Sequence, residues 1–323
     1  MTPDLFVLAQ VGATGSSAAQ ALVTGLSLGS IYALLAMGFV IIFKATQVLN
    51  LAHGALASMG ALFVAVFATV WDIPQRWLPD WPAWSTWTIS VLLALLAAAL
   101  AGMAIERIFI RPMVGEELFA IAIVTLGLDI ALRTVINDFI GTDSRPLGDP
   151  WGTGVFDLGF VRIAYTEVVQ LAVTVVLVLA VALFFRTRLG VAMRATAFDQ
   201  EAARAQGINV GRIFGLSWAI GAVLATVGGI FLSVFPRRGA GLDTQTALFV
   251  FAAFPAIILG GLDSIVGAVV GGMIIGMAQA YASLLPWEFL GTGFSGAVPY
   301  FIMLIVLLIR PYGLFGTEEI RRV

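Results

Sequence analysis

Nine long apolar runs follow one another along the sequence, and they dictate what kind of fold the chain can form. They cover residues 19–43, 53–70, 86–105, 117–139, 165–185, 213–235, 246–262, 264–285 and 297–310. An α-helix needs about 20 apolar residues to cross the hydrocarbon core of a bilayer, and it satisfies its own backbone hydrogen bonds there. We therefore expect an all-α, polytopic membrane bundle of eight or nine helices, forming one domain over residues 1–323. The runs at 53–70 and 246–262 are short enough to be broken or re-entrant.

Composition excludes several other classes of protein. The chain is 60% hydrophobic and 11% charged, whereas soluble proteins contain about a quarter charged residues. The runs are continuous rather than alternating, which excludes a transmembrane β-barrel. A net charge of -2 argues against binding to nucleic acid. The absence of cysteine excludes disulfides and thiolate metal sites.

Lys44 is the only lysine in the chain. A phosphate-binding loop of the G-x-x-x-x-G-K-[ST] type requires a lysine followed by serine or threonine, but Lys44 is followed by Ala45. If a nucleotide drives the activity of this protein, another chain must bind that nucleotide.

The distribution of arginine predicts the orientation of the bundle. Segment 186–212 contains five arginines, whereas segment 141–164 contains two, together with three aspartates. Because basic residues accumulate on the cytoplasmic side of membrane proteins, we expect 186–212 to be cytoplasmic and 141–164 to be external. Counting spans from this point places the N-terminus outside and the C-terminus in the cytoplasm.

Glycines cluster in the second half of the chain, and the cluster includes small-xxx-small spacings. The clustered residues are Gly260, Gly261, Gly267, Gly271, Gly272 and Gly276. Such spacings allow helices to approach closely in lipid, so close packing is the first interpretation. The alternative is a broken helix that lines a water-filled cavity.

A polar, alanine-rich stretch at 194–209 lies between two spans on the predicted cytoplasmic side. It ends at Gly207, which is followed by Ile208 and Asn209, and this order is typical of a helix stop. We expect a short helix lying along the membrane, which could fit a groove on a soluble protein and transmit its movements. A solvated loop is the alternative.

A few polar residues fall within or next to the apolar runs. Asp129 and Arg133 have the i,i+4 spacing of a helical ion pair, so either they stabilise each other or Asp129 and Thr125 lie in a transport pathway. Asp129 could also carry a proton in a secondary transporter. His53 is the only histidine, and no second ligand nearby suggests a metal site. His53, with Gln47 and Asn50, has either a packing role or a pathway role.

Glu201-Ala202-Ala203, followed by Gly207, resembles the EAA loop of permeases in bacterial ABC importers. Longer motifs resemble the branched-chain amino acid permease family, and they occur in the family order. They are Gly25 to Leu34, Asn50-Leu-Ala-His53-Gly54, Ile105-Glu106-Arg107 with Arg111-Pro112, Leu259 to Ala268, and Arg310 to Gly316. The resemblance covers residues 20–316 and is closer to the first of two paired permeases. Leu51 and Ala55 depart from it, since the family often has phenylalanine and an acid there.

The resemblance implies a subunit of an ATP-driven importer in the bacterial inner membrane. Its expected partners are a second permease (a homologue or another copy of this chain), two cytoplasmic ATPase subunits and an external substrate-binding protein. ATP and Mg²⁺ would bind to the ATPase subunits, and this chain would contain no cofactor, metal or catalytic residue. The implied substrates are branched-chain or related amino acids; urea, short amides and small carboxylates are alternatives.

The resemblance also assigns residues to two sites. Residues 194–209 would form the coupling helix within the cytoplasmic loop 186–212, and the residues that couple it to the ATPase would be Arg194, Asp199, Glu201, Ala202, Ala203, Arg204 and Gly207. Glu201, Arg194, Asp199 and Arg204 would make its polar contacts, and Gly207 would end it. The expected translocation pathway includes Gln47, Asn50, His53, Thr125 and Asp129.

Other classes of membrane protein fit the sequence less well. An ion-coupled carrier normally has several buried carboxylates, whereas the spans here offer Asp129, which has Arg133 nearby. A channel requires a selectivity filter or charged rings, and we find neither motif. An intramembrane enzyme would require paired aspartates or an H-E-x-x-H motif, which the spans lack. We therefore expect a transport subunit rather than an enzyme.

Overall fold

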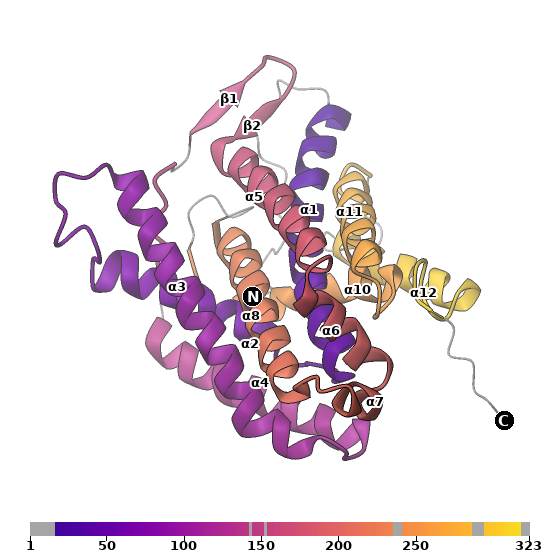
Figure 1. Cartoon of the computed structure of the whole chain (residues 1–323). Coiled ribbons are helices and arrows are strands. Elements are labelled where there is room, and N and C mark those ends of the chain that lie inside the picture. Colours follow the sequence, from indigo (N-terminus) through magenta and orange to yellow (C-terminus); the bar gives the residue numbers. More distant parts are fainter. Residues whose placement is uncertain (1–16, 142–143, 152–153, 235–240, 286–293, 318–323) are drawn as a thin grey trace.

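The computed structural model describes residues 17–141, 144–151, 154–234, 241–285 and 294–317, and these residues form a bundle of helices (Figure 1). The long helices are α1 (Ser17–Thr46), α2 (His53–Ala65), α3 (Ala83–Ile105), α4 (Leu118–Ile140), α5 (Tyr165–Phe184), α8 (Val210–Val234) and α11 (Ile265–Ala282). The shorter ones are α6 (Arg188–Phe198), α7 (Gln200–Ala205), α9 (Thr246–Phe249), α10 (Phe254–Gly260) and α12 (Val298–Ile309). In the described part of the chain, seven helical stretches are long and apolar enough to cross a membrane. The all-α membrane fold is thus confirmed.

Several runs are less regular than a plain α-helix. Helix α2 continues into a π-helical turn, η1 (Val66–Val70), and α3 continues into η2 (Glu106–Ile110) and a 3-10 turn, η3 (Arg111–Met113). The run at 246–262 consists of α9, a 3-10 turn η4 (Val250–Ala253) and α10. Pro255 lies in the first turn of α10, where its missing N–H costs nothing, and α10 ends at Gly261 with φ of 101°. A further 3-10 turn, η5 (Phe294–Gly296), precedes α12.

Helices α1 and α8 form the centre of the bundle. The apolar windows of α1 and α8 are 89% and 83% buried, whereas those of α3, α4 and α5 are between 22% and 28% buried. Helix α1 packs against both α11 and α8, and α8 also contacts α2 and α3. A helix that is apolar on all sides is expected either in a core or in lipid. The exposed apolar faces of α3, α4 and α5 are therefore available to lipid or to another chain.

Glycine allows α11 to lie directly against α1. A Cβ atom added to Gly276 would lie 2.2 Å from the backbone nitrogen of Gly29, and one added to Gly272 would lie 2.5 Å from that of Ala33. The contacting residues are spaced four apart on both helices, which is the small-xxx-small arrangement. Of the two interpretations of the glycine cluster, the structure supports close packing at Gly272 and Gly276.

A short hairpin in the 141–164 segment is an exception to the helical architecture. Strand β1 (Val155–Asp157) pairs antiparallel with β2 (Arg162–Ala164). The Asp157 carboxylate accepts the backbone N–H of Gly159 and pairs with Arg162 at 2.9 Å, and these two contacts lower the pKa of Asp157. The side chain of Gln20, on α1, exchanges two hydrogen bonds of 3.0 Å with the backbone of Arg162. The hairpin is thus attached to the start of the central helix.

Candidate functional site

The polar loop between α5 and α8 folds into two helices, not the single short helix that we expected over 194–209. Helix α6 ends at Phe198, and Asp199 has an extended backbone with φ of -156°. The Asp199 carboxylate accepts the N–H groups of Glu201 and Ala202, each at 2.9 Å, and so caps the start of α7. Aspartate favours this N-cap position over a helix interior, which explains why the chain breaks there.

Helix α7 stops at the glycine that the sequence suggested. Gly207 has φ of 81°, a left-handed conformation that costs glycine nothing. The N–H of Gly207 donates to the carbonyl of Arg204, and the N–H of Ile208 donates to that of Ala203, which is the Schellman arrangement. Gly207 therefore ends α7 and turns the chain towards α8.

Helix α7 has one buried face and one exposed face. Ala203 is buried and belongs to a small apolar cluster with Val210 and Phe214 of α8, against which Ile208 packs. The residues of the coupling prediction that are exposed at this corner are Asp199, Glu201, Ala202, Arg204 and Gly207. Because its buried face is held against α8, a force applied to the exposed face of α7 acts directly on α8.

Arg194 has a different position from the rest of the predicted coupling set. It lies on α6, and its guanidinium donates to the carbonyl of Phe185, the residue that ends α5. This contact links α6 to the residue that follows α5.

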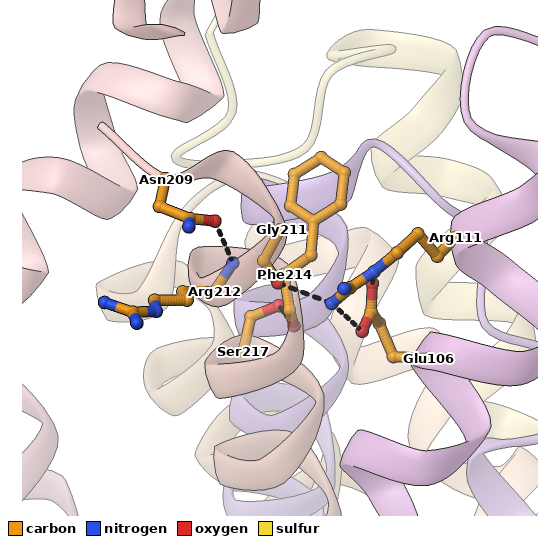
Figure 2. Close-up of polar contacts among 7 residues, drawn as sticks. All are labelled: Glu106, Arg111, Asn209, Gly211, Arg212, Phe214 and Ser217. Atoms are coloured by element: carbon orange, nitrogen blue, oxygen red, sulfur yellow. Dashed lines mark hydrogen bonds and ion pairs between the residues drawn. The ribbon is translucent and has the colours of Figure 1, made fainter. Parts of the chain in front are cut away.

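An ion pair at the end of α3 is hydrogen-bonded to the start of α8, as Figure 2 shows. Arg111 donates to both carboxylate oxygens of Glu106, at 3.0 and 2.7 Å, and its Nη2 also donates to the carbonyl of Gly211 at 2.7 Å. Glu106 is completely buried, whereas the side chain of Arg111 is 39% exposed. Such a two-pronged pair is stronger and more directional than a single contact. We refer to Glu106, Arg111 and the Gly211 carbonyl as the α3–α8 clasp.

The first turn of α8 is ordered by its own residues. The side-chain oxygen of Asn209 accepts the N–H of Arg212 at 3.0 Å, and the Ser217 hydroxyl donates to the carbonyl of Phe214 at 2.8 Å (Figure 2). Asn209 thereby caps the helix at its N-terminus. The corner is continuous: α7 packs on the start of α8, and the clasp connects that start to α3.

The residues expected in the pathway do not form one group. Gln47, at the end of α1, is exposed and lines a cavity of about 370 Å³ together with Gln200, Glu201 and Arg204. It thus lies beside α7, and it also lines a second cavity next to α6. Asn50, His53, Thr125 and Asp129 are instead buried within the chain.

The buried members hold the connection between α1 and α2. The Thr125 hydroxyl donates to the carbonyl of Leu49 at 3.0 Å and accepts the N–H of Leu51 at 3.2 Å. His53 donates through Nε2 to the carbonyl of Leu35 at 3.0 Å, and its ring lies edge-on to Phe39. The side-chain amide of Asn50 has no partner among the described residues.

Asp129 forms the ion pair that its spacing suggested. Its carboxylate lies 2.7 Å from the guanidinium of Arg133, four residues later on α4. The carboxylate also faces the backbone N–H of Ala55, in the first turn of α2, outside hydrogen-bond geometry. A helix N-terminus carries partial positive charge, so Asp129 is stabilised both by Arg133 and by α2.

The α3–α8 clasp was missed in our sequence reasoning. Glu106 and Arg111 belong to a family motif, but we assigned them no role. The sequence feature that could have identified them is an acid followed five residues later by an arginine, at the C-terminal end of an apolar run. Nothing in the sequence predicted that Arg111 would contact Gly211, which lies 100 residues further along the chain.

The bundle and its helical corner define a multi-pass membrane protein, and comparison with known proteins gives its family. The family described as branched-chain amino acid transport system, permease component, matches residues 21–307. The chain belongs to this family, so it is a transport subunit rather than an enzyme.

Individual relatives cover nearly the whole chain. It is 31% identical over 312 residues to the high-affinity branched-chain amino acid transport system permease protein BraD of Pseudomonas aeruginosa, covering 94% of this chain and 97% of that protein. It is 30% identical over 321 residues to the corresponding protein LivH of Escherichia coli, with the same coverage. Among solved structures, it is similar to PsaBC from Streptococcus pneumoniae in complex with Fab, with a TM-score of 0.44, 15% identity, and coverage of 91% of this chain and 92% of that chain.

Proposed function

We propose that this chain is the membrane-spanning permease subunit of an ATP-driven ABC importer in the bacterial inner membrane. It forms the translocation pathway for branched-chain or related amino acids that an external binding protein delivers. Membership of the permease family supports this proposal. The observation that carries it is the α7 corner, where a short helix exposes Asp199, Glu201 and Arg204 while its other face packs on a central helix.

The partners in this proposal are a second permease chain, two cytoplasmic ATPase subunits and the external binding protein. The second permease is a homologue or another copy of this chain. The lack of a phosphate-binding loop around Lys44 is the reason to place ATP and Mg²⁺ in separate subunits. The largely exposed apolar faces of α3, α4 and α5 offer area both for lipid and for the second permease.

Coupling follows from the connections at the corner. An ATPase that closes on nucleotide displaces α7 through contacts with Glu201 and Arg204. Ala203 passes the displacement to Phe214 and Val210 of α8, and the clasp passes it to α3. Because packed helices move as rigid bodies, a small shift of α7 reorients spans within the membrane.

The buried polar residues have mainly structural roles in this proposal. Thr125 and His53 anchor the connection between α1 and α2, and Asp129 stabilises the N-terminus of α2. Asp129 is already paired with Arg133, which argues against a proton carrier and hence against an ion-coupled transporter. We retain a pathway role for Asn50, because a buried amide without a partner is costly unless water or a ligand satisfies it.

Replacing Glu201 with lysine is expected to lower ATP-dependent uptake at least about tenfold, because a charge placed against a complementary interface costs several kcal/mol. Uptake would be measured with the co-expressed ATPase and binding proteins in proteoliposomes, and co-purification of the ATPase would be measured alongside. Glu117→Lys is the matched control: it makes the same change of charge at an exposed residue outside α7. Normal uptake by Glu201→Lys would contradict the coupling role. Uptake driven by an ion gradient without ATP would contradict the importer itself.

The proposed orientation can be tested because the chain contains no cysteine. A cysteine at position 200 is expected to react with a membrane-impermeant maleimide in inverted vesicles but not in intact cells. A cysteine at Leu158, which is 55% exposed on the hairpin, is expected to show the opposite behaviour. Labelling of position 200 in intact cells would reverse the topology.

A further inference from the structure

A second cavity lies beside α6, and it shares Gln47 with the cavity at α7 but none of the α7 residues. Its volume is about 680 Å³, within the range of small-ligand pockets. The end of α1, helix α6, the connection between α10 and α11, and the chain around the end of α12 all contribute to its lining. Segments far apart in the sequence thus meet around one space, and each of them ends on the predicted cytoplasmic side.

Two cations line this cavity. Lys44 is half-buried, and its ammonium donates to the backbone carbonyl of Asp263 at 2.7 Å. Arg194 lines the cavity from α6, where it donates to Phe185. Within the described part of the chain, neither cation forms an ion pair. Both retain N–H donors, since an ammonium has three and a guanidinium has five.

The cavity lining also contains one carboxylate, that of Asp263, so two cations face one anion there. Asp263 accepts the hydroxyl and the backbone N–H of Thr317, and so holds the segment that follows α12. Lys44 gains some stabilisation from its place in the last turn of α1, where the helix dipole favours a cation. The dipole of α1 does not explain why Arg194 of another helix lines the same space.

The rest of the cavity wall is apolar. Phe43, Leu262 and Leu307 line it, and next to Leu307 the side chains of Leu308 and Ile309 are 87% and 74% exposed. A ligand that satisfies both parts of the wall has an anionic head and hydrocarbon chains. Basic pockets between helices on the cytoplasmic side of membrane proteins bind such lipid headgroups.

We propose that this cavity binds one anionic phospholipid, with its phosphate between Lys44 and Arg194 and an acyl chain along the end of α12. This proposal does not depend on the transport function proposed above. Free phosphate shares the headgroup chemistry but lacks the chains, so the two sources can be separated by experiment.

The unique lysine makes the test specific. Reductive ¹³C-methylation of the full chain labels Lys44 and the N-terminal amine, and a Lys44→Arg variant identifies the Lys44 signal by its loss. In phosphatidylcholine nanodiscs, the Lys44 methyl resonance is expected to shift saturably as phosphatidylglycerol is added. Arg194→Gln is expected to weaken this binding about fivefold, the contribution of one cation near an anionic lipid. Arg194→Lys is expected to retain it, which separates loss of charge from misfolding.

Arg188→Gln provides the matched control, because Arg188 is an exposed arginine of α6 outside the cavity lining. The Arg188→Gln variant is expected to bind phosphatidylglycerol as tightly as the chain without this substitution. The proposal is overturned if phosphatidylglycerol leaves the Lys44 resonance unchanged or if Arg188→Gln weakens binding as much as Arg194→Gln. It is also overturned if inorganic phosphate reproduces the shift in pure phosphatidylcholine nanodiscs, which would make this a phosphate site rather than a lipid site.

Discussion

Alanine in place of Gly276 is expected to destabilise the protein by about 3 kcal/mol, the upper part of the range for overpacked cores. The new Cβ would lie 2.2 Å from the nitrogen and 2.3 Å from the Cα of Gly29, both backbone atoms of α1. No change of side-chain rotamer can relieve such a contact, so α11 must move away from the central helix. The effect would be measured as unfolding in mixed micelles titrated with sodium dodecyl sulfate.

Gly127→Ala provides a matched control for this prediction. Gly127 also lies within a long helix, α4, but a Cβ added there would meet nothing within 4 Å. Both substitutions gain the same helix propensity, about 1 kcal/mol in a helix interior. The difference in stability between the two variants therefore measures the effect on the contact between α1 and α11. Equal stability of the two variants would show that α11 does not lie directly on α1.

Replacing Arg111 with methionine is expected to cost about 3–5 kcal/mol, because it leaves the completely buried carboxylate of Glu106 without its partner. Replacing the other partner, Glu106→Gln, is expected to cost less stability. Arg111 is 39% exposed and keeps its bond to the carbonyl of Gly211, so its charge is not stranded in the core. The two variants would be compared in the same unfolding assay.

Two further variants make the clasp prediction specific. Arg107→Met removes an exposed arginine four residues before Arg111 and is expected to change stability by less than about 0.5 kcal/mol. The double variant Glu106→Met with Arg111→Met is expected to recover most of the loss, since apolar replacement of a whole buried pair is often neutral. If Arg111→Met and Arg107→Met were equally stable, the clasp would contribute little to the join between α3 and α8.

The local features of this protein could be predicted from its sequence. Apolar runs of membrane length predict helices because each helix forms its hydrogen bonds within itself. The ion pair between Asp129 and Arg133 follows from their spacing on one helix, and the end of α7 at Gly207 follows from the backbone freedom of glycine. Each of these depends on residues within a few positions of one another.

Features that depend on distant residues were decided by the tertiary structure. Gln47, which we predicted in the pathway, shares a cavity with Glu201, because the end of α1 is brought beside α7. Arg111 reaches Gly211, 100 residues away, and Tyr32 donates to Gln279, 247 residues away. The periodicity of a sequence reports which face of a helix is apolar, but not which partner covers that face. The membrane fold was therefore determined locally, whereas the α3–α8 clasp and the cavity beside α6 arise only where the packed helices bring distant residues together.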